Sequence, residues 1–203
     1  MGLKTPTSWT KHSNNQIFLL STDKSLLSLD AINAAYGSDD MYWNTELPRD
    51  MLGNILDNSL CFGVYKVKPS TLCNEQHSSS SSSSSSSAST QNMGQSSKKE
   101  HLELEQVGFA RLVTDTCTFA FLTDVYILPS YRANGLGVWL LDGINEVVHS
   151  MPRLRWFTLR TGSEKSVQCY QKQFGMEIFD NDRDGHGVFM ASRGRGWEFT
   201  GGH

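Results

Sequence analysis

The sequence contains no long apolar run and only four cysteines. No apolar stretch approaches the ~20 residues that cross a bilayer, so we expect no membrane contact. The cysteines, at positions 61, 73, 117 and 169, form no Cys-x-x-Cys pair and have no histidines at zinc spacing, so we expect no metal site. No apolar signal core follows Met1–Pro6. We therefore expect free thiols and a protein that is either cytoplasmic or both cytoplasmic and nuclear.

The sequence also lacks an excess of charge of either sign. Its formal net charge is −3, and its lysines and arginines are scattered along the chain. Proteins that bind nucleic acid or an anionic membrane usually carry a basic patch, so we expect neither partner. With 203 residues, of which 38% are hydrophobic, the chain is long enough for a single domain with its own core.

One segment is almost devoid of apolar residues. Ser78–Ser87 is an unbroken serine run, and polar residues surround it from about Pro69 to Glu105. Such a segment buries too little apolar surface to offset the entropy of ordering, so we expect a disordered insert over about 69–105. The flanking segments Leu60–Val67 and Gln106–Val113 have the composition of strands. The insert is expected at the tip of a β-hairpin, because lengthening a loop costs little additional entropy.

Strand and helix patterns alternate along the rest of the chain. Besides the two strands of the hairpin, strands are expected at 16–20, 119–127, 156–160, 177–179 and 188–191. Helices are expected over about 26–35, behind a Thr22/Asp23 cap, and over 48–56, 135–151 and 167–174. This order combines antiparallel hairpins with one β-α-β crossover, so we predict an α+β or mixed α/β fold with its core between about 16 and 191.

The stretch from Asp124 to Leu141 carries the most chemical information. A strand ends there, a loop with Pro129 and Arg132 follows, and glycines at 135 and 137 open a helix. The unpaired N–H groups at a helix start attract anions, and the helix dipole reinforces this attraction. Glycine lets the backbone come close to a phosphate. This stretch therefore predicts a site for a phosphate-bearing ligand.

Three kinds of phosphate-binding loop compete for this stretch. The P-loop requires Gly-Lys-Ser/Thr, which the sequence does not contain. The dinucleotide fingerprint G-x-G-x-x-G fails because Leu140 occupies its third glycine position, and the acidic residue expected about twenty positions later is missing. A dinucleotide oxidoreductase is therefore disfavoured. The third pattern, R-x-x-G-x-G, is matched completely by RANGLG at residues 132–137.

At these residues the chain resembles the GNAT superfamily of N-acetyltransferases, whose loop reads [QR]-x-x-G-x-[GA]. The similarity extends upstream over TDVYILPSYR at 123–132. Downstream, CYQKQFGM at 169–176 resembles the family's L-Y-x-K-x-G-F, with one residue inserted before Gly175. The order of elements also resembles that of the family, and small stand-alone members are the most similar. The resemblance implies the GNAT fold, a mixed and mostly antiparallel sheet flanked by helices, and an acyltransferase that uses acetyl-CoA.

The resemblance further implies which residues bind acetyl-CoA. Main-chain groups of Val125, Tyr126 and Ile127 would contact the pantetheine and polarise the thioester carbonyl. The pyrophosphate would lie against the main-chain N–H groups of the glycine loop, which comprise those of Arg132, Asn134, Gly135, Leu136, Gly137 and Val138.

Two residues are candidates for the chemistry itself. By the resemblance, Tyr170 would stand beside the thioester sulfur and assist the departing thiolate; the alternative is a tyrosine packed in the core. Some relatives carry a glutamate as the base on the fourth strand, where this chain has Phe121 and Thr123. Asp124 is adjacent, but strand alternation would turn it to the opposite face unless a bulge re-aims it. Asp124 is therefore either a substrate-facing or a structural carboxylate, and a water relay or an amine of low pKa would replace the glutamate.

Taken together, the residues and the resemblance predict an N-acetyltransferase in which the amine attacks acetyl-CoA directly in a ternary complex. The acceptor would be a small-molecule or peptide amine, and Tyr36, Tyr42 and Trp43 are candidates for its pocket. A homodimer is compatible with this interpretation. The alternative function is a non-catalytic acyl-CoA-binding sensor or scaffold, because the base glutamate is missing.

Overall fold

The computed structural model describes residues 6–41, 43–68, 103–132, 134–181 and 188–193. These residues form one eight-stranded sheet in the order β1-β2-β3-β4-β5-β6-β8-β7. Neighbouring strands pair antiparallel except β5 and β6, which are parallel. The strands are β1 (Ser8–Ser13), β2 (Gln16–Ser21), β3 (Leu60–Lys68), β4 (Glu103–Thr114), β5 (Phe119–Ile127), β6 (Trp156–Thr161), β7 (Glu177–Asn181) and β8 (Val188–Arg193). The predicted fold class is confirmed.

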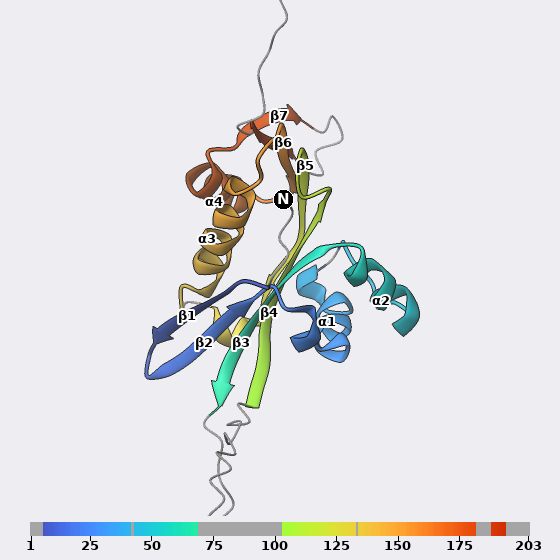
Figure 1. Ribbon diagram of the computed structural model, residues 1–203, viewed down its shortest axis with the longest axis vertical. Helices are drawn as coiled ribbons and strands as arrows, with labels where there is room; N and C mark the ends of the chain where they lie inside the picture. The colour runs from blue at the N-terminus through green and yellow to red at the C-terminus, as the bar shows by residue number, and fades with distance from the viewer. Residues whose placement is uncertain (1–5, 42, 69–102, 133, 182–187, 194–203) are drawn as a thin grey trace, which may run out of the picture.

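Helices cover both faces of the sheet (Figure 1). Helices α1 (Leu29–Tyr36) and α2 (Arg49–Asp57) lie on one face, and α3 (Leu136–His149) and α4 (Glu164–Phe174) lie on the other. Helix α3 connects β5 to β6 and so makes the single crossover that parallel neighbours require. None of the helices in the described part of the chain is long and apolar enough to cross a membrane.

Each face of the sheet has its own apolar core. On the α3 side, Leu140, Ile144 and Val147 of the helix belong to one cluster with Phe18 and Leu20 of β2. On the α1 side, a smaller cluster is formed by side chains of α1, α2 and the central strands: Ile32, Ala35, Tyr36, Met41, Leu52, Leu56, Cys61, Phe109 and Tyr126. The sheet is therefore buried on both faces near its centre, and this fixes the position of β5 between the two helix layers.

The N-terminal strand β1 is absent from the sequence-based prediction. It pairs with β2 across a turn at Asn14 and Asn15, whose φ angles of 49° and 58° are both positive. Asparagine tolerates this conformation, and a two-residue turn with both φ positive suits the twist of a hairpin. The alternating burial of Ser8–Ser13 is the corresponding period-two signal, which is weak because this edge strand is polar.

The first helix is shorter than predicted. Asp23 does act as a cap, but only for the short 3₁₀ turn Lys24–Leu26, where its side chain accepts from the Ser25 N–H. Helix α1 begins three residues later behind a second cap, Ser28, whose hydroxyl accepts from the Ala31 N–H. The spacing of apolar residues fits a helix that starts behind either cap, Asp23 or Ser28. The two starting points therefore differ only in the geometry of the cap.

The predicted insert interrupts the connection between β3 and β4. These strands pair antiparallel as far as Lys68 opposite Glu103, and their side chains form an ion pair of 3.2 Å. Residues 103–105, which we had expected in the insert, belong to β4. The rest of the predicted insert, 69–102, lies outside the described residues.

The pairing of Lys68 with Glu103 suggests that residues 69–102 can be replaced by a two-residue Asn-Gly turn. A shorter loop loses less entropy when its ends are brought together, so the melting temperature should stay the same or rise slightly. Differential scanning calorimetry of both proteins checks this. A melting temperature lower by several degrees would show that the segment supports the fold.

Candidate functional site

Strands β5 and β6 separate near the centre of the sheet. They are paired from Phe119 with Trp156 to Leu122 with Leu159, and the pairing ends there. A cavity of about 390 Å³ lies where the strands diverge. It is lined by residues of β5, of β6 with the following loop and α4, and of the α1–α2 connection: Phe121, Leu122, Thr123, Asp124 and Val125; Leu159, Arg160, Thr161, Gly162, Ser163, Ser166 and Tyr170; and Trp43. The cavity thus receives side chains from both faces of the sheet.

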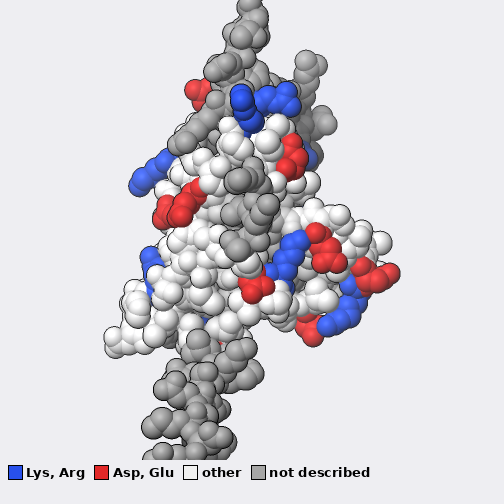
Figure 2. Space-filling model, in the orientation of Figure 1, with Lys and Arg blue, Asp and Glu red and all other residues white. Residues whose placement is uncertain are grey.

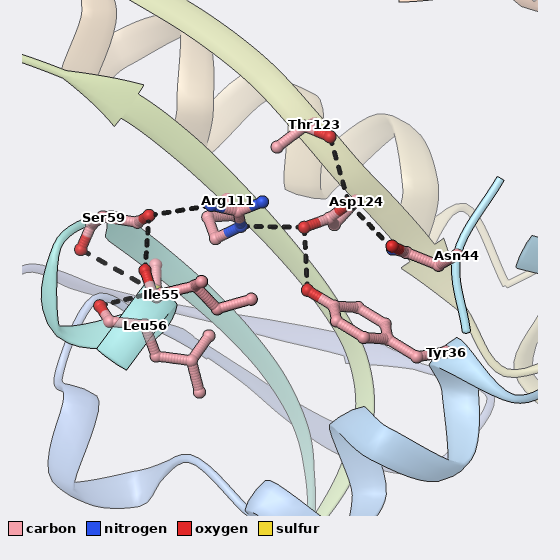
Figure 3. A network of polar contacts seen from close by, with 9 residues as sticks. Tyr36, Asn44, Ile55, Leu56, Ser59, Arg111, Thr123 and Asp124 are labelled. Carbon is pink, nitrogen blue, oxygen red and sulfur yellow. Dashed lines mark hydrogen bonds and ion pairs between the residues drawn. The ribbon is translucent and has the colours of Figure 1, made fainter. Parts of the chain in front are cut away.

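A β-bulge shapes the wall of this cavity. Phe109 pairs with Tyr126 whereas Arg111 pairs with Thr123, so β5 contains one residue more than β4 over this interval. Asp124 lies in the bulge with a φ of 56°, a left-handed conformation that is uncommon for residues other than glycine. Strand alternation is therefore broken, and Thr123 and Asp124 both turn toward the side of α1 (Figure 3). The expectation that they lie on opposite faces is corrected by the bulge.

The Asp124 carboxylate is buried and accepts four hydrogen bonds (Figure 3). Its Oδ2 accepts from the Tyr36 hydroxyl and from Nε of Arg111, both at 2.8 Å. Its Oδ1 accepts from the Thr123 hydroxyl at 3.0 Å and from the Asn44 amide at 3.1 Å. An ionised carboxylate offers about four lone-pair sites, so these donors fill it.

This network joins three separate parts of the chain to the bulge. Tyr36 is the last residue of α1, Asn44 follows it in the α1–α2 connection, and Arg111 comes from β4 and also donates to the Ser59 hydroxyl at 3.1 Å. Burial, and then the nearby Asp124 carboxylate, raise the pKa of Tyr36 well above its usual value. The hydroxyl therefore stays protonated and acts as a donor.

Tyr170 lies at the cavity on the α4 side. Helix α4 begins at Glu164, three residues before the predicted start, because Ser163 caps it by accepting from the Ser166 N–H. The Tyr170 ring stacks on Phe174, with 6.0 Å between centroids and an angle of 8°. Burial raises the pKa of Tyr170 to about 12. Its hydroxyl is therefore protonated throughout the neutral range and can donate a hydrogen bond into the cavity.

The glycine loop forms the predicted helix start, one residue later than expected. Gly135 caps α3 with a φ of 68°, and the first helical hydrogen bond runs from the Trp139 N–H to the Gly135 carbonyl. The N–H groups before Trp139 therefore have no partner within the helix. A Cβ at Gly137 would have no atom within 4 Å, so the space beside this turn is open. The main chain here can hold an anion.

The Arg132 side chain is directed elsewhere. Its Nε donates to the Ile127 carbonyl at 2.9 Å, its guanidinium pairs with Asp40 at 3.1 Å, and it lies over the Tyr126 ring at 5.8 Å. Arg132 thus ties the loop to the connection after α1. These contacts occupy the carbonyl of Ile127, and the Arg132 N–H donates to the Pro129 carbonyl at 3.2 Å. The predicted phosphate contact from the Arg132 N–H is therefore not available in this structure.

Two residues of the N-terminal hairpin approach the glycine loop, and sequence reasoning missed both. The Asn14 amide donates to the Asn134 side chain at 2.6 Å. Lys11 Nζ lies 3.9 Å from the position of a Cβ at Gly135 and 6.0 Å from the centroid of Trp139. Finding them required the strand β1, because they lie more than a hundred residues from the loop in sequence.

The three aromatic candidates for an acceptor pocket have different surroundings. Tyr36 is buried in the Asp124 network. Trp43 is 50% exposed and lines the cavity from the α1–α2 connection. Tyr42 lies outside the described residues. Charges of both signs lie side by side over α1 and α2, next to this connection (Figure 2). Among the described residues, no group of His, Cys, Asp or Glu side chains could hold a metal ion.

The fold agrees with comparisons to known proteins. The sequence model of the acetyltransferase (GNAT) family matches residues 100–176. A candidate acetyltransferase of Gibberella zeae is 35% identical over 186 residues, which cover 92% of each chain. The chain belongs to the GNAT family, and it is an acyltransferase of the N-acetyltransferase class.

Solved structures show the same architecture. A GNAT-family structure from Xanthomonas campestris pv. campestris has a TM-score of 0.50 and 25% identity, over 77% of this chain and 83% of that one. Arabidopsis thaliana NAA60, solved with a bisubstrate analogue, has a TM-score of 0.51 and 11% identity, over 94% of this chain and 99% of that one. At this identity NAA60 shows a shared fold only.

The Asp124 network should contribute strongly to stability. Replacing Arg111 by Met leaves a buried carboxylate without its counter-charge, which we expect to lower the free energy of unfolding by about 3–5 kcal/mol. Arg49→Met removes the exposed partner of Asp30 and should cost about 0–1 kcal/mol. Urea unfolding of both variants checks this. Equal losses would show that the Asp124–Arg111 pair is no more important than a surface pair.

Proposed function

We propose that the protein transfers an acetyl group from acetyl-CoA to an amine by direct attack in a ternary complex. The observation that carries this proposal is the cavity between the diverging β5 and β6, which is reached from both faces of the sheet. Tyr170 lines it from the α4 side, and Trp43 lines it from the α1–α2 side. Two substrates that approach from opposite faces would therefore meet there.

Acetyl-CoA would enter on the side of α3 and α4. Helix α3 starts after the loop of residues 128–135, which follows the C-terminal end of β5, and this end of β5 separates from β6. A pyrophosphate at the free N–H groups of Leu136, Gly137 and Val138 would be stabilised by the helix dipole. Lys11 would add a positive charge beside Gly135. The pantetheine would then extend along Val125 toward the cavity.

In the reaction, the amine nitrogen attacks the thioester carbonyl carbon, and the carbonyl π electrons move to oxygen. When the oxyanion re-forms the carbonyl, the C–S bond breaks and sulfur leaves with its electron pair. The amine gives up one proton to water, and the thiolate takes up one proton. The Tyr170 hydroxyl supports the departing sulfur by donating a hydrogen bond in the transition state, where such donors are most effective.

The acceptor amine must lose a proton before it attacks. For a lysine-like amine with a pKa near 10.4, reaching the neutral form at pH 7 costs about 4–5 kcal/mol. The four donors on Asp124 leave no lone pair for this proton, so water is the acceptor that the cavity allows.

The lack of a direct base is also what a non-catalytic acyl-CoA-binding module would show. Release of free CoA thiol across a panel of amines and peptides separates the two functions.

The phosphate site can be tested at Gly137. Gly137→Asp places a negative charge in open space at the start of α3, so the fold should persist while acetyl-CoA binding weakens by at least tenfold. Gly53→Asp is the matched control, since a Cβ at this α2 glycine also meets no atom within 4 Å. Thermal shift with acetyl-CoA gives the measurement. Unchanged stabilisation of the Gly137→Asp protein would remove the pyrophosphate from this loop.

The role of Tyr170 can be tested by removing only its hydroxyl. Tyr170→Phe keeps the stacking on Phe174, so acetyl-CoA affinity should be nearly unchanged while kcat falls by roughly tenfold or more. Because the pKa of Tyr170 is raised to about 12, the hydroxyl keeps its proton below that pH. The ratio of the two kcat values should therefore be constant from pH 7 to 10. Equal kcat values where chemistry limits the rate would return Tyr170 to a packing role.

A further inference from the structure

We infer that the Thr123 hydroxyl receives the acceptor amine, and that Asp124 is the positioning residue that aims this hydroxyl. The inference rests on the proposed function and assigns a contact on the acceptor side of the same cavity. Thr123 is half-buried on β5 and lines the cavity immediately beside Asp124.

The direction of one hydrogen bond decides what Thr123 can offer. Its hydroxyl lies 3.0 Å from Asp124 Oδ1. An ionised carboxylate only accepts hydrogen bonds, so the hydroxyl proton must point to Asp124. The two lone pairs of Oγ1 then remain for the cavity. Thr123 is therefore an acceptor toward any molecule in the cavity, which suits an N–H group and disfavours a bare carbonyl or carboxylate.

The rest of the network keeps this orientation fixed. Tyr36, Arg111 and Asn44 occupy the other lone pairs of Asp124 and come from α1, β4 and the α1–α2 connection. Burial opposes the charge of Arg111, but the adjacent carboxylate more than offsets it and raises the arginine pKa. The Asp124 carboxylate is thus held by donors from three parts of the chain. The bulge places both Thr123 and Asp124 on this side, where regular alternation would separate them.

The contact has a defined consequence for the reaction. An amine that donates one N–H to Thr123 Oγ1 has its lone pair directed away from Thr123. The lone pair can then face the thioester carbonyl along Val125, and the N–C bond forms as described above. Thr123 neither gains nor loses a proton, and the amine proton leaves to water. Thr123 thereby reduces the orientations that the amine must search, an effect that well-positioned groups supply in enzymes.

A pair of CoA thioethers tests the contact without knowledge of the natural acceptor. One carries S–CH₂–C(=O)–NH–CH₃ and mimics a joined donor and amine; the other carries the methyl ester, with oxygen in place of N–H. Their dissociation constants are measured by calorimetry with the wild-type protein, Thr123→Val and Thr123→Ser. Thr158→Val is the matched control, because Thr158 lies opposite Phe121 on β6 and has no hydrogen bond to the network. Acetyl-CoA is titrated into every protein.

The wild type should bind the amide roughly three- to tenfold more tightly than the ester, the effect of one neutral hydrogen bond. Thr123→Val should lose this preference, whereas Thr123→Ser and Thr158→Val should keep it, and acetyl-CoA affinity should be unchanged throughout. A preference that persists in folded Thr123→Val, or is absent from the wild type, overturns the inference.

Two further outcomes are also decisive. If the wild type does not bind acetyl-CoA, the proposed function fails and the inference falls with it, which the acetyl-CoA titration reports separately. If Thr123→Val does not fold, Thr123→Ala replaces it, with the same loss of preference expected.

Asp124→Asn tests the positioning role, because an amide in place of the carboxylate cannot accept from all four donors. This variant should bind acetyl-CoA but no longer prefer the amide, and a retained preference would exclude a positioning role for Asp124.

Discussion

The arrangement around the cavity depends on a single buried ion pair, between Asp124 on β5 and Arg111 on β4. Asp124 adopts a left-handed backbone conformation that is uncommon for residues other than glycine, and the hydrogen bonds from its partners offset the cost of that conformation. Because the carboxylate lies in the bulge, the same contacts that satisfy it also fix the path of β5 and the end of α1. The pair is therefore a contact that the strand, the helix and the cavity wall share.

The two faces of the sheet present different chemical groups to the cavity. On the α3 side, the glycine loop and Tyr170 supply main-chain donors and a hydroxyl, which suit a phosphate and a departing sulfur. On the α1 side, the Asp124 network and the exposed Trp43 border the part of the cavity that an amine would reach. The separation of β5 from β6 connects these sides, and in the proposed function the two substrates would meet there.

Local signals predicted much of this structure from the sequence. The R-x-x-G-x-G loop specifies its own conformation, because Gly135 needs a positive φ and Gly137 must leave space beside the helix start. The family could be inferred from such motifs. The Asp124 network could not, since Tyr36, Asn44 and Arg111 reach Asp124 over 88, 80 and 13 residues of sequence. The bulge that joins them is visible only in the register of strand pairing. The position of Lys11 could not be predicted either, because it lies on a polar edge strand without a strong apolar period.

The separation of β5 and β6 has a consequence for solubility. Unpaired strand edges normally invite another chain to add a strand, and proteins protect their outer edges against this. Here the unpaired edges lie inside the sheet, with α3 and α4 on one side and α1 and α2 on the other (Figure 1). Each of these edges is therefore covered by helices on both sides, unlike the outer edge of a sheet. In the proposed function, the backbone groups of β5 at this covered edge would serve a small molecule, the pantetheine arm, rather than a strand of another chain.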